Sequence, residues 1–282
     1  MLIVDSQVHI WAANSLERPW LTGAKAHCEP PLSAQLLLQK MDEAHVSRAL
    51  LVPPSWDQDR NDLVLKAAHD YPDRFAAMGR FDLYATDAQS QLARWLEQPG
   101  MRGMRLSFTL PAYSKPYQEG QLNHLFSELE RLCIPLMALI DYDGTQRMAQ
   151  VAQDFPQLKI ALCHLGLPTG AKDEAAFAHF KRILPLARYP NIMMKASALP
   201  AYTREPYPFY FLHPYLKALF ETFGPQRIFW GSDLGRLPCT YKEVIELFTQ
   251  ELQWLSQSDL EGIMGKNVCD WLGWSYENPD QA

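Results

Sequence analysis

The chain has 282 residues and a formal net charge of −6, with no long block of Lys or Arg, which argues against a nucleic-acid-binding protein. Hydrophobic residues make up 48% and charged residues 21%, so the chain can form a large hydrophobic core and disorder is not expected. Five scattered cysteines without a Cys-x-x-Cys pair, an N-terminus unlike a leader and the lack of a membrane-length apolar run predict a cytoplasmic protein without membrane contacts.

Eight short apolar runs, separated by segments with helical patterns, predict a repeated strand-and-helix chain. They cover residues 2–10, 48–54, 75–83, 101–108, 134–142, 158–166, 191–199 and 227–235. Residues 33–45 and 121–133 place apolar side chains at helical spacing, and Ser33 is expected to cap the first of these helices. A further helix is expected over residues 258–272, beginning with a capping box at Ser258.

This alternation without a dividing linker predicts one α/β domain over residues 1–282. Eight strands, each followed by a helix, are typical of a (β/α)8 TIM barrel. An open, doubly wound parallel sheet is the alternative fold.

Polar side chains gather at the carboxyl ends of the predicted strands, where TIM-barrel enzymes build their active sites. In the first run, Asp5, Gln7 and His9 occupy alternate positions, which on a regular strand point to one side. The other strand ends supply Ser55, Arg105, Asp141, His164, Lys195, Ser197 and Asp233. Burying several ionisable groups at one rim is costly, so the set predicts a reaction centre.

The chemistry of this set suits hydrolysis. Asp233 could act as general base toward water, and His9 and His164 could polarise a carbonyl or bind a metal ion that does so. Each residue also has a structural alternative: either histidine could be a satisfied core residue, Asp233 could cap the following helix, and Asp5 is expected to be a framework hydrogen-bond partner.

Two arginines could hold a substrate carboxylate through paired hydrogen bonds. Arg105 lies in the fourth run and Arg236 lies just after Asp233. With Ser55, they are the predicted substrate-binding residues beside Gln7, and they favour an anionic small molecule as substrate.

Two groups near strand ends leave alternatives open. The aromatic residues after the first two strands either wall the pocket or pack in the core; they are Trp11, Trp20 and Trp56. The long segment after the seventh strand either contacts substrate or packs on the surface; its residues are Tyr202, Arg204, Tyr207 and His213.

These segments resemble the amidohydrolase superfamily, in its branch of lactonases and related metal-dependent decarboxylases. VDSQVHIW is similar to the family's strand-one motif Asp-x-His-x-His, and GMRGMRLSF to the strand-four region, with Arg105 in the arginine position. KIALCHLG resembles the strand that carries a site histidine, here His164. FGPQRIFWGSDLG resembles the strand-eight segment whose aspartate is catalytic, here Asp233, and MGKNVCDWLGW resembles the closing helix.

Strand one departs from the family motif. Gln7 replaces the first histidine, and a neutral amide oxygen is a weaker ligand than imidazole. Because the family includes lactonases that work without metal, the resemblance implies that no cofactor is required and that Gln7 and His9 polarise the substrate directly. The alternative is one Zn²⁺ or Mn²⁺ ion held by His9, His164 and Asp233, with few ligands and therefore weak binding.

The resemblance implies a hydrolase that opens a carboxylated or sugar-derived lactone, with Asp233 activating water and His9 and His164 polarising the carbonyl. One alternative is a metal-dependent hydrolase or decarboxylase of the same superfamily. The other is a barrel that binds a ligand without catalysis.

Overall fold

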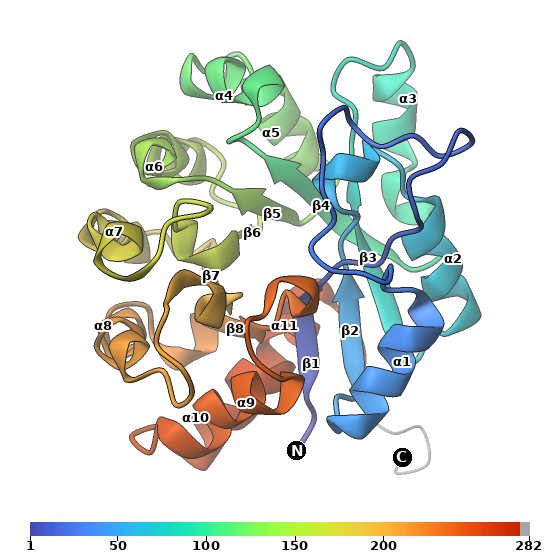
Figure 1. The fold of residues 1–282 in the computed structure, drawn as a ribbon. Coiled ribbons are helices and arrows are strands. Elements are labelled where there is room, and N and C mark those ends of the chain that lie inside the picture. The colour runs from blue at the N-terminus through green and yellow to red at the C-terminus, as the bar shows by residue number, and fades with distance from the viewer. Residues whose placement is uncertain (277–282) are drawn as a thin grey trace.

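The computed structural model describes residues 1–276, in which eight parallel strands form a nearly closed barrel surrounded by helices (Figure 1). Neighbouring strands pair in chain order from first to last. The strands are β1 (Val4–Val8), β2 (Arg48–Leu51), β3 (Phe75–Arg80), β4 (Met101–Ser107), β5 (Leu136–Leu139), β6 (Ile160–Leu162), β7 (Ile192–Ser197) and β8 (Ile228–Gly231). Each lies within a predicted run, so the single-domain TIM barrel is confirmed and the open sheet is not formed. Residues 277–282 of the expected domain lie outside the described residues.

The helices lie outside the barrel and follow the strands (Figure 1). They are α1 (Ala34–Glu43), α2 (Asp62–Asp70), α3 (Ala88–Ala93), α4 (Pro111–Gln118), α5 (Asn123–Arg131), α6 (Thr145–Asp154), α7 (Asp173–Phe177), α8 (His213–Phe223), α9 (Tyr241–Glu246), α10 (Gln257–Glu261) and α11 (Asn267–Leu272). Within residues 1–276, no helix combines the length and apolar character needed to cross a membrane.

Two of the three predicted helices form as expected, and the third begins earlier. Ser33 caps α1 by accepting the backbone N–H of Leu36. The cap predicted at Ser258 is wrong: Ser256 has the extended backbone of a cap residue and accepts the N–H of Asp259, so Ser258 lies inside α10. The segment then passes through a π-helical turn, Gly262–Lys266, before α11.

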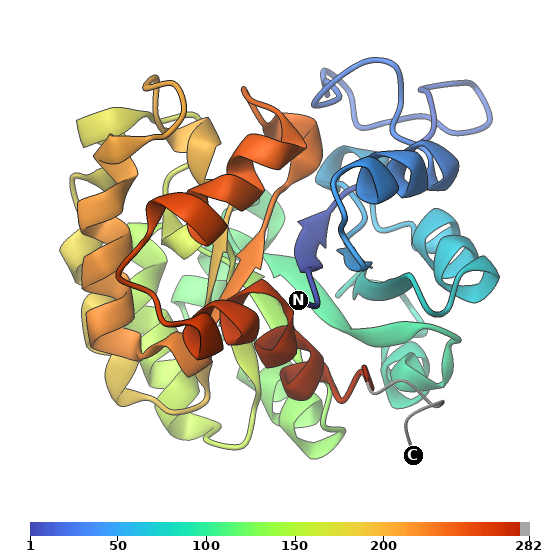
Figure 2. The same ribbon diagram turned by 90° about the horizontal axis from the view of Figure 1, so that it is seen from below.

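The amino end of the barrel is filled and closed by apolar side chains. Inward-facing Leu50, Met78, Met137 and Phe229 form one buried cluster with residues of α11, including Trp271. In Figure 2, α11 lies across the end of the barrel at which β1 begins. A polar pocket can therefore form only at the opposite, carboxyl end of the strands.

Asp5 joins β1 to β8, where the barrel closes. Its carboxylate accepts the N–H and hydroxyl of Ser232, the hydroxyl of Tyr241 at 2.6 Å and the N–H of Gln7 at 3.0 Å. Gly231 allows this close approach, because a Cβ there would lie 3.1 Å from the backbone nitrogen of Gln7. Burial raises the pKa of Asp5, and these hydrogen bonds oppose the rise. Asp5 is a framework residue, as expected.

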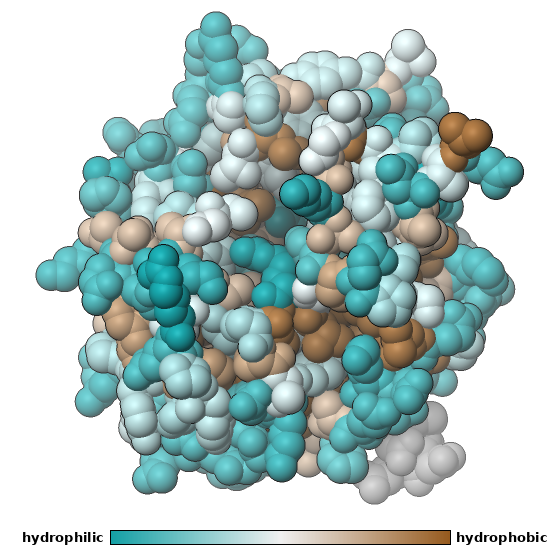
Figure 3. All heavy atoms as spheres, viewed as in Figure 1, coloured by the Kyte–Doolittle hydropathy of each residue, from teal (hydrophilic) through white to brown (hydrophobic). Residues whose placement is uncertain are grey.

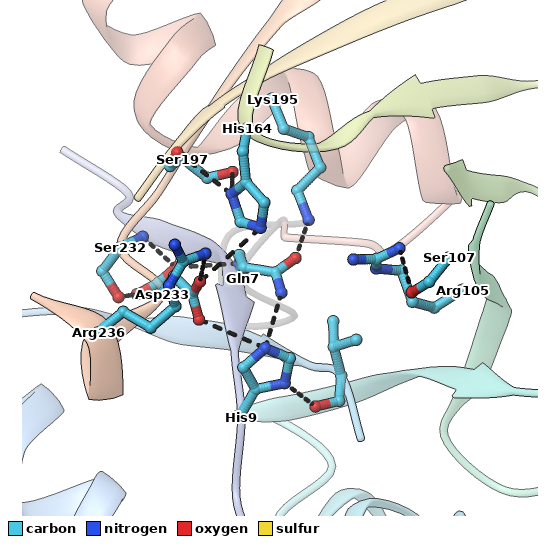
Figure 4. Close-up of polar contacts among 12 residues, drawn as sticks. Gln7, His9, Arg105, Ser107, His164, Lys195, Ser197, Ser232, Asp233 and Arg236 are labelled. Atoms are coloured by element: carbon cyan, nitrogen blue, oxygen red, sulfur yellow. Dashed lines mark hydrogen bonds and ion pairs between the residues drawn. The ribbon is translucent and has the colours of Figure 1, made fainter. Parts of the chain in front are cut away.

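The prediction that Asp5 points to the same side as Gln7 and His9 is wrong. Between Asp5 and Val8 the pairing of β1 with β2 shifts by one residue, which resets the alternation of side chains. Asp5 consequently faces Tyr241 at the seam with β8, while Gln7 and His9 point toward the barrel interior (Figure 4).

Candidate active site

A pocket of about 500 Å³ opens at the carboxyl end of the barrel. Figure 3 shows hydrophilic side chains gathered at the centre of this face. The structure brings most of the predicted site residues to the pocket wall, namely His9, Ser55, Arg105, His164, Asp233 and Arg236. Arg80 and His27, which were not predicted, also line it, whereas Gln7 does not.

Asp233 lies at the base of this pocket and is 1% exposed. Its Oδ1 is 3.4 Å from Nε2 of His9, and its Oδ2 is 3.8 Å from Nε2 of His164 and 3.3 Å from Nη1 of Arg236 (Figure 4). Oδ1 receives no hydrogen bond from the described residues. Burial would raise the pKa of Asp233, but the charge of Arg236, and of either histidine whenever its ring is protonated, holds the pKa below its usual range, so the side chain is a carboxylate.

The backbone is strained at both Asp233 and His164. Each lies two residues after the end of a strand, β8 for Asp233 and β6 for His164, and has a positive φ, 55° and 53° respectively, which non-glycine residues rarely adopt. Such a conformation costs on the order of 1–3 kcal/mol and is found mainly at functional sites. The Asp233 side chain makes no helix-cap hydrogen bond, so the alternative of a simple cap is not realised.

The two histidines present the same ring atom to Asp233. Nδ1 of His9 lies 2.6 Å from the carbonyl oxygen of Val52, and Nδ1 of His164 lies 3.2 Å from that of Ser197. Because a carbonyl only accepts, Nδ1 of His9 donates a proton, and Nε2 of its neutral ring carries a lone pair. Nδ1 of His164 also lies 2.9 Å from the hydroxyl of Ser197, which can either donate or accept. Burial lowers the pKa of both histidines and favours these neutral rings. Each histidine is thus anchored on one side and open on the other.

Gln7 lies beneath the pocket, and its side-chain amide contacts the Nε2 atom of His9. Its Oε1 accepts a hydrogen bond from Nζ of Lys195 at 2.5 Å, which turns its amide nitrogen toward Nε2 of His9, 3.3 Å away (Figure 4). Burial lowers the pKa of Lys195 to about 8. The side chain of Gln7 is fully buried, is used by these two partners and does not line the pocket, and its contact with substrate stays a prediction.

The opposite wall, from β3 and β4, carries two buried arginines. Nη1 of Arg105 donates to the carbonyl of Leu106 at 2.7 Å and lies 3.3 Å from Oγ of Ser107, while its buried Nε has no acceptor among the described residues. Arg80 is instead tied to Asp59 at 3.0 Å. Of these two arginines, Arg105 is thus the one without an acidic partner within residues 1–276. The strand-end rule that indicated Arg105 applies equally to Arg80, which was overlooked.

Arg236 belongs to the Asp233 side of the pocket. Its guanidinium pairs with that carboxylate and stands over the ring of Tyr202, 5.5 Å from the ring centre. Ser55 lines the pocket at the start of a short 3₁₀ turn, Ser55–Asp57. Substrate binding by Arg236 and Ser55 stays a prediction.

His27 comes from the long connection between β1 and α1, which crosses the carboxyl face of the barrel (Figures 1 and 2). One ring nitrogen of His27, one of His9 and one carboxylate oxygen of Asp233 lie within 4.8 Å of one another. Nδ1 of His27 is buried without a partner among the described residues, and burial lowers the pKa of the ring to about 3. Sequence reasoning missed His27 because it follows no strand and belongs to no recognised spacing.

The chemistry of this donor set fits a divalent metal ion. Two neutral imidazoles and one carboxylate are common ligands of catalytic zinc, which keeps a fourth position open. The unpartnered Oδ1 of Asp233 and Nδ1 of His27 show that hydrogen bonds within the described chain do not use up these polar atoms. His164 faces the other oxygen of Asp233.

The aromatic residues divide between the wall and the packing behind it. Trp56 lines the pocket, and Trp11 and Trp20 pack against it with ring centres 5.6 and 6.2 Å away. Neither Trp11 nor Trp20 lines the pocket.

The segment after β7 lies away from the pocket lining. Arg204 pairs with Asp173 at 2.6 Å, and the hydroxyl of Tyr207 donates to Glu251 at 2.6 Å. The remaining two residues considered there, Tyr202 and His213, are also absent from the lining. Tyr202 is fully buried beneath Arg236, and substrate contact by this segment stays a prediction.

Comparison with known proteins places these residues in a family. The amidohydrolase family model matches residues 4–274. The chain belongs to the amidohydrolase family. This match confirms the predicted superfamily and the prediction of an enzyme with hydrolase chemistry.

One curated protein is similar to this chain in sequence, and two solved structures share its fold. The chain is 25% identical over 232 residues to L-fucono-1,5-lactonase of Burkholderia ambifaria, covering 82% of this chain and 79% of that one. A zinc-bound amidohydrolase structure from Burkholderia multivorans superposes with a TM-score of 0.81 at 20% identity, covering 97% and 99% of the two chains. A candidate 2-pyrone-4,6-dicarboxylic acid hydrolase from Acinetobacter baumannii, with citric acid bound, gives 0.76 at 17% identity, covering 97% and 100%.

Proposed function

We propose that this protein hydrolyses a lactone that carries a carboxylate, producing the corresponding hydroxy acid. The observation that carries the proposal is the pairing of a buried carboxylate, Asp233, with an opposite wall on which Arg105 has no acidic partner among the described residues. The lactonase relative and the dicarboxylic acid hydrolase among the structural neighbours support a small lactone as substrate.

In the proposed reaction, the carboxylate of Asp233 takes a proton from a water molecule as the water oxygen attacks the lactone carbonyl. The carbonyl π electrons move to oxygen, and their return expels the ring oxygen with its bonding pair. The proton on Asp233 then passes to this alkoxide. One water is consumed, one ring C–O bond is broken, and Asp233 is restored.

The developing negative charge on the carbonyl oxygen needs stabilisation from the side of His9 and His164. The neutral ring of His9 offers only a lone pair at Nε2, so donation requires a proton there. Asp233, 3.4 and 3.8 Å from the two Nε2 atoms, favours such a proton, whereas burial opposes it. A bound divalent metal ion, held by His9, His27 and Asp233, would supply positive charge to polarise the carbonyl and acidify water.

Recognition of the substrate carboxylate falls to the opposite wall. Arg105 is 5% exposed, and its Nη1 is fixed by Leu106 and Ser107, so the guanidinium is held in place before substrate arrives. A desolvated, charge-assisted hydrogen bond to such a group is stronger than a neutral one. Arg105 is therefore proposed to select carboxylated over neutral lactones.

The test is to incubate the protein with matched carboxylated and neutral lactones, following proton release and identifying hydroxy acids by mass. The proposal expects hydroxy acid from the carboxylated set well above the uncatalysed rate. Binding of carboxylated lactones without ring opening would contradict it and favour the non-catalytic alternative. Carbon dioxide release from aromatic carboxylates, without lactone opening, would favour the decarboxylase alternative.

A further inference from the structure

We infer that His27 completes a divalent-cation site with His9 and Asp233 at the carboxyl end of the barrel. The site contains a ligand from the β1–α1 connection, outside the eight strands. It stands apart from the proposed lactone chemistry, because a cation can bind there whether or not a lactone is opened.

The first support is that two acceptor atoms, Nε2 of His9 and Oδ1 of Asp233, face each other. Nδ1 of His9 donates to the carbonyl of Val52, so the lone pair of the ring lies at Nε2 and faces Oδ1 of Asp233 at 3.4 Å. Two acceptor atoms that face each other repel unless positive charge lies between them. Oδ1 is 1% exposed at the residue level and receives no hydrogen bond from the described residues. Among the described residues, the one donor that faces His9 Nε2 is the amide of Gln7, at a long 3.3 Å.

The second support is the spacing of the three donor atoms. Tetrahedral zinc with bonds of about 2.0–2.1 Å separates its ligand atoms by roughly 3.3 Å. The distance between His9 Nε2 and Asp233 Oδ1 matches this separation. One ring nitrogen of His27 lies within 4.8 Å of a ring nitrogen of His9 and of a carboxylate oxygen of Asp233, which places all three residues around one possible cation position.

The third support is how His27 is held and what it replaces. Its ring packs edge-on against Trp56, with ring centres 4.5 Å apart, so the imidazole is held at the pocket edge. On β1, the side chain of Gln7 is diverted to Lys195 and does not reach the pocket. The imidazole missing from strand one is thus compensated by His27, which changes the expectation of a weak site with few ligands.

The experiment measures zinc binding without substrate. The purified full-length protein is stripped with a chelator, dialysed free of it, and titrated with Zn²⁺ by calorimetry, with thermal unfolding recorded with and without Zn²⁺. The same measurements are made on His27→Asn, on Asp233→Asn, and on His69→Asn as a matched control, because the side chain of His69 is 74% exposed.

The inference expects one Zn²⁺ per chain and a higher unfolding temperature when Zn²⁺ is present. His27→Asn should weaken affinity by about tenfold to a hundredfold or more, Asp233→Asn should also weaken it, and His69→Asn should not. Absence of binding to the wild type, or equal affinity in His27→Asn and wild type, would overturn the inference. Unfolding of the stripped variants shows whether each has kept its fold. Zinc binding in a protein that opens no lactone would refute the proposed function and leave this site standing.

Discussion

The β8–β1 side of the pocket and the β3–β4 side are both formed by polar residues at strand ends. They differ in whether these residues have hydrogen-bond partners within the protein. On the first side, Asp233 and the two facing histidines keep hydrogen-bonding capacity that the described chain leaves unused. On the second side, Arg80 is paired with Asp59, and Arg105 is fixed by neighbouring oxygen atoms. The difference suggests that chemistry and recognition can be separated by substitution.

The largest expected effect is on the β8–β1 side. Asp233→Asn removes the proposed general base with little change of shape, so kcat should fall by about 10²–10⁴-fold while KM changes little. Steady-state kinetics on a carboxylated lactone measure both constants. A fall in kcat of less than about tenfold would remove Asp233 from the role of base.

The next largest effect concerns the stability of the protein. It arises from Lys195, the buried lysine that donates a hydrogen bond to Gln7. Burial lowers its pKa in the folded protein to about 8, from an ordinary value of 10.5. Between these values the unfolded chain binds more protons, so the free energy of unfolding should rise with pH, and below pH 8 this contribution should be flat. The difference in pKa corresponds to about 3 kcal/mol.

Denaturant unfolding of wild type and Lys195→Met is measured from about pH 7 to about pH 11.5, roughly one unit beyond the two pKa values, and checks this slope. The variant should lack the rise that the wild type shows. Parallel pH profiles in the two proteins would mean that Lys195 has an ordinary pKa.

On the recognition side, Arg105→Met should raise KM for a carboxylated lactone and leave kcat nearly unchanged. Hydrogen bonds to charged groups contribute about 1.5–3 kcal/mol, which corresponds to roughly 10–100-fold in kcat/KM. A variant whose kcat falls as far as that of Asp233→Asn would show that the two sides are not separable.

The smallest effects come from a matched pair of serines. Oγ of Ser197 lies 2.9 Å from Nδ1 of His164, and Oγ of Ser107 lies 3.3 Å from Nη1 of Arg105. In both cases a backbone carbonyl remains as partner, so Ser→Ala at either position should change rates only about two- to fivefold, near 0.5–1 kcal/mol. Ser197→Ala should act on kcat and Ser107→Ala on KM, and the reverse assignment would contradict the division of roles.

The sequence predicted the fold well because a TIM barrel depends on a repeated local pattern. Eight apolar runs with helices between them leave few topologies, and the strand-end rule brought Asp233, His164 and Arg105 to one pocket. Arg80 is the last residue of β3, so the same rule also predicts that its side chain lies at this pocket.

Other features depend on tertiary contacts that no local pattern shows. The shift in pairing that turns Asp5 away from Gln7 depends on how β1 meets β2. His27 reaches the site from an irregular connection, where spacing predicts nothing about position. Gln7 could be placed on the inner face from sequence, but its partner Lys195 lies 188 positions away along the chain.

The most direct test of the account compares kcat/KM for one lactone bearing a carboxylate with kcat/KM for the same lactone bearing a neutral amide, in wild type and in Arg105→Met. The account predicts that the wild type opens both rings and prefers the carboxylate by about 10–100-fold, and that the substitution removes this preference. Equal rates for both lactones in the wild type, or an undiminished preference in Arg105→Met, would contradict it.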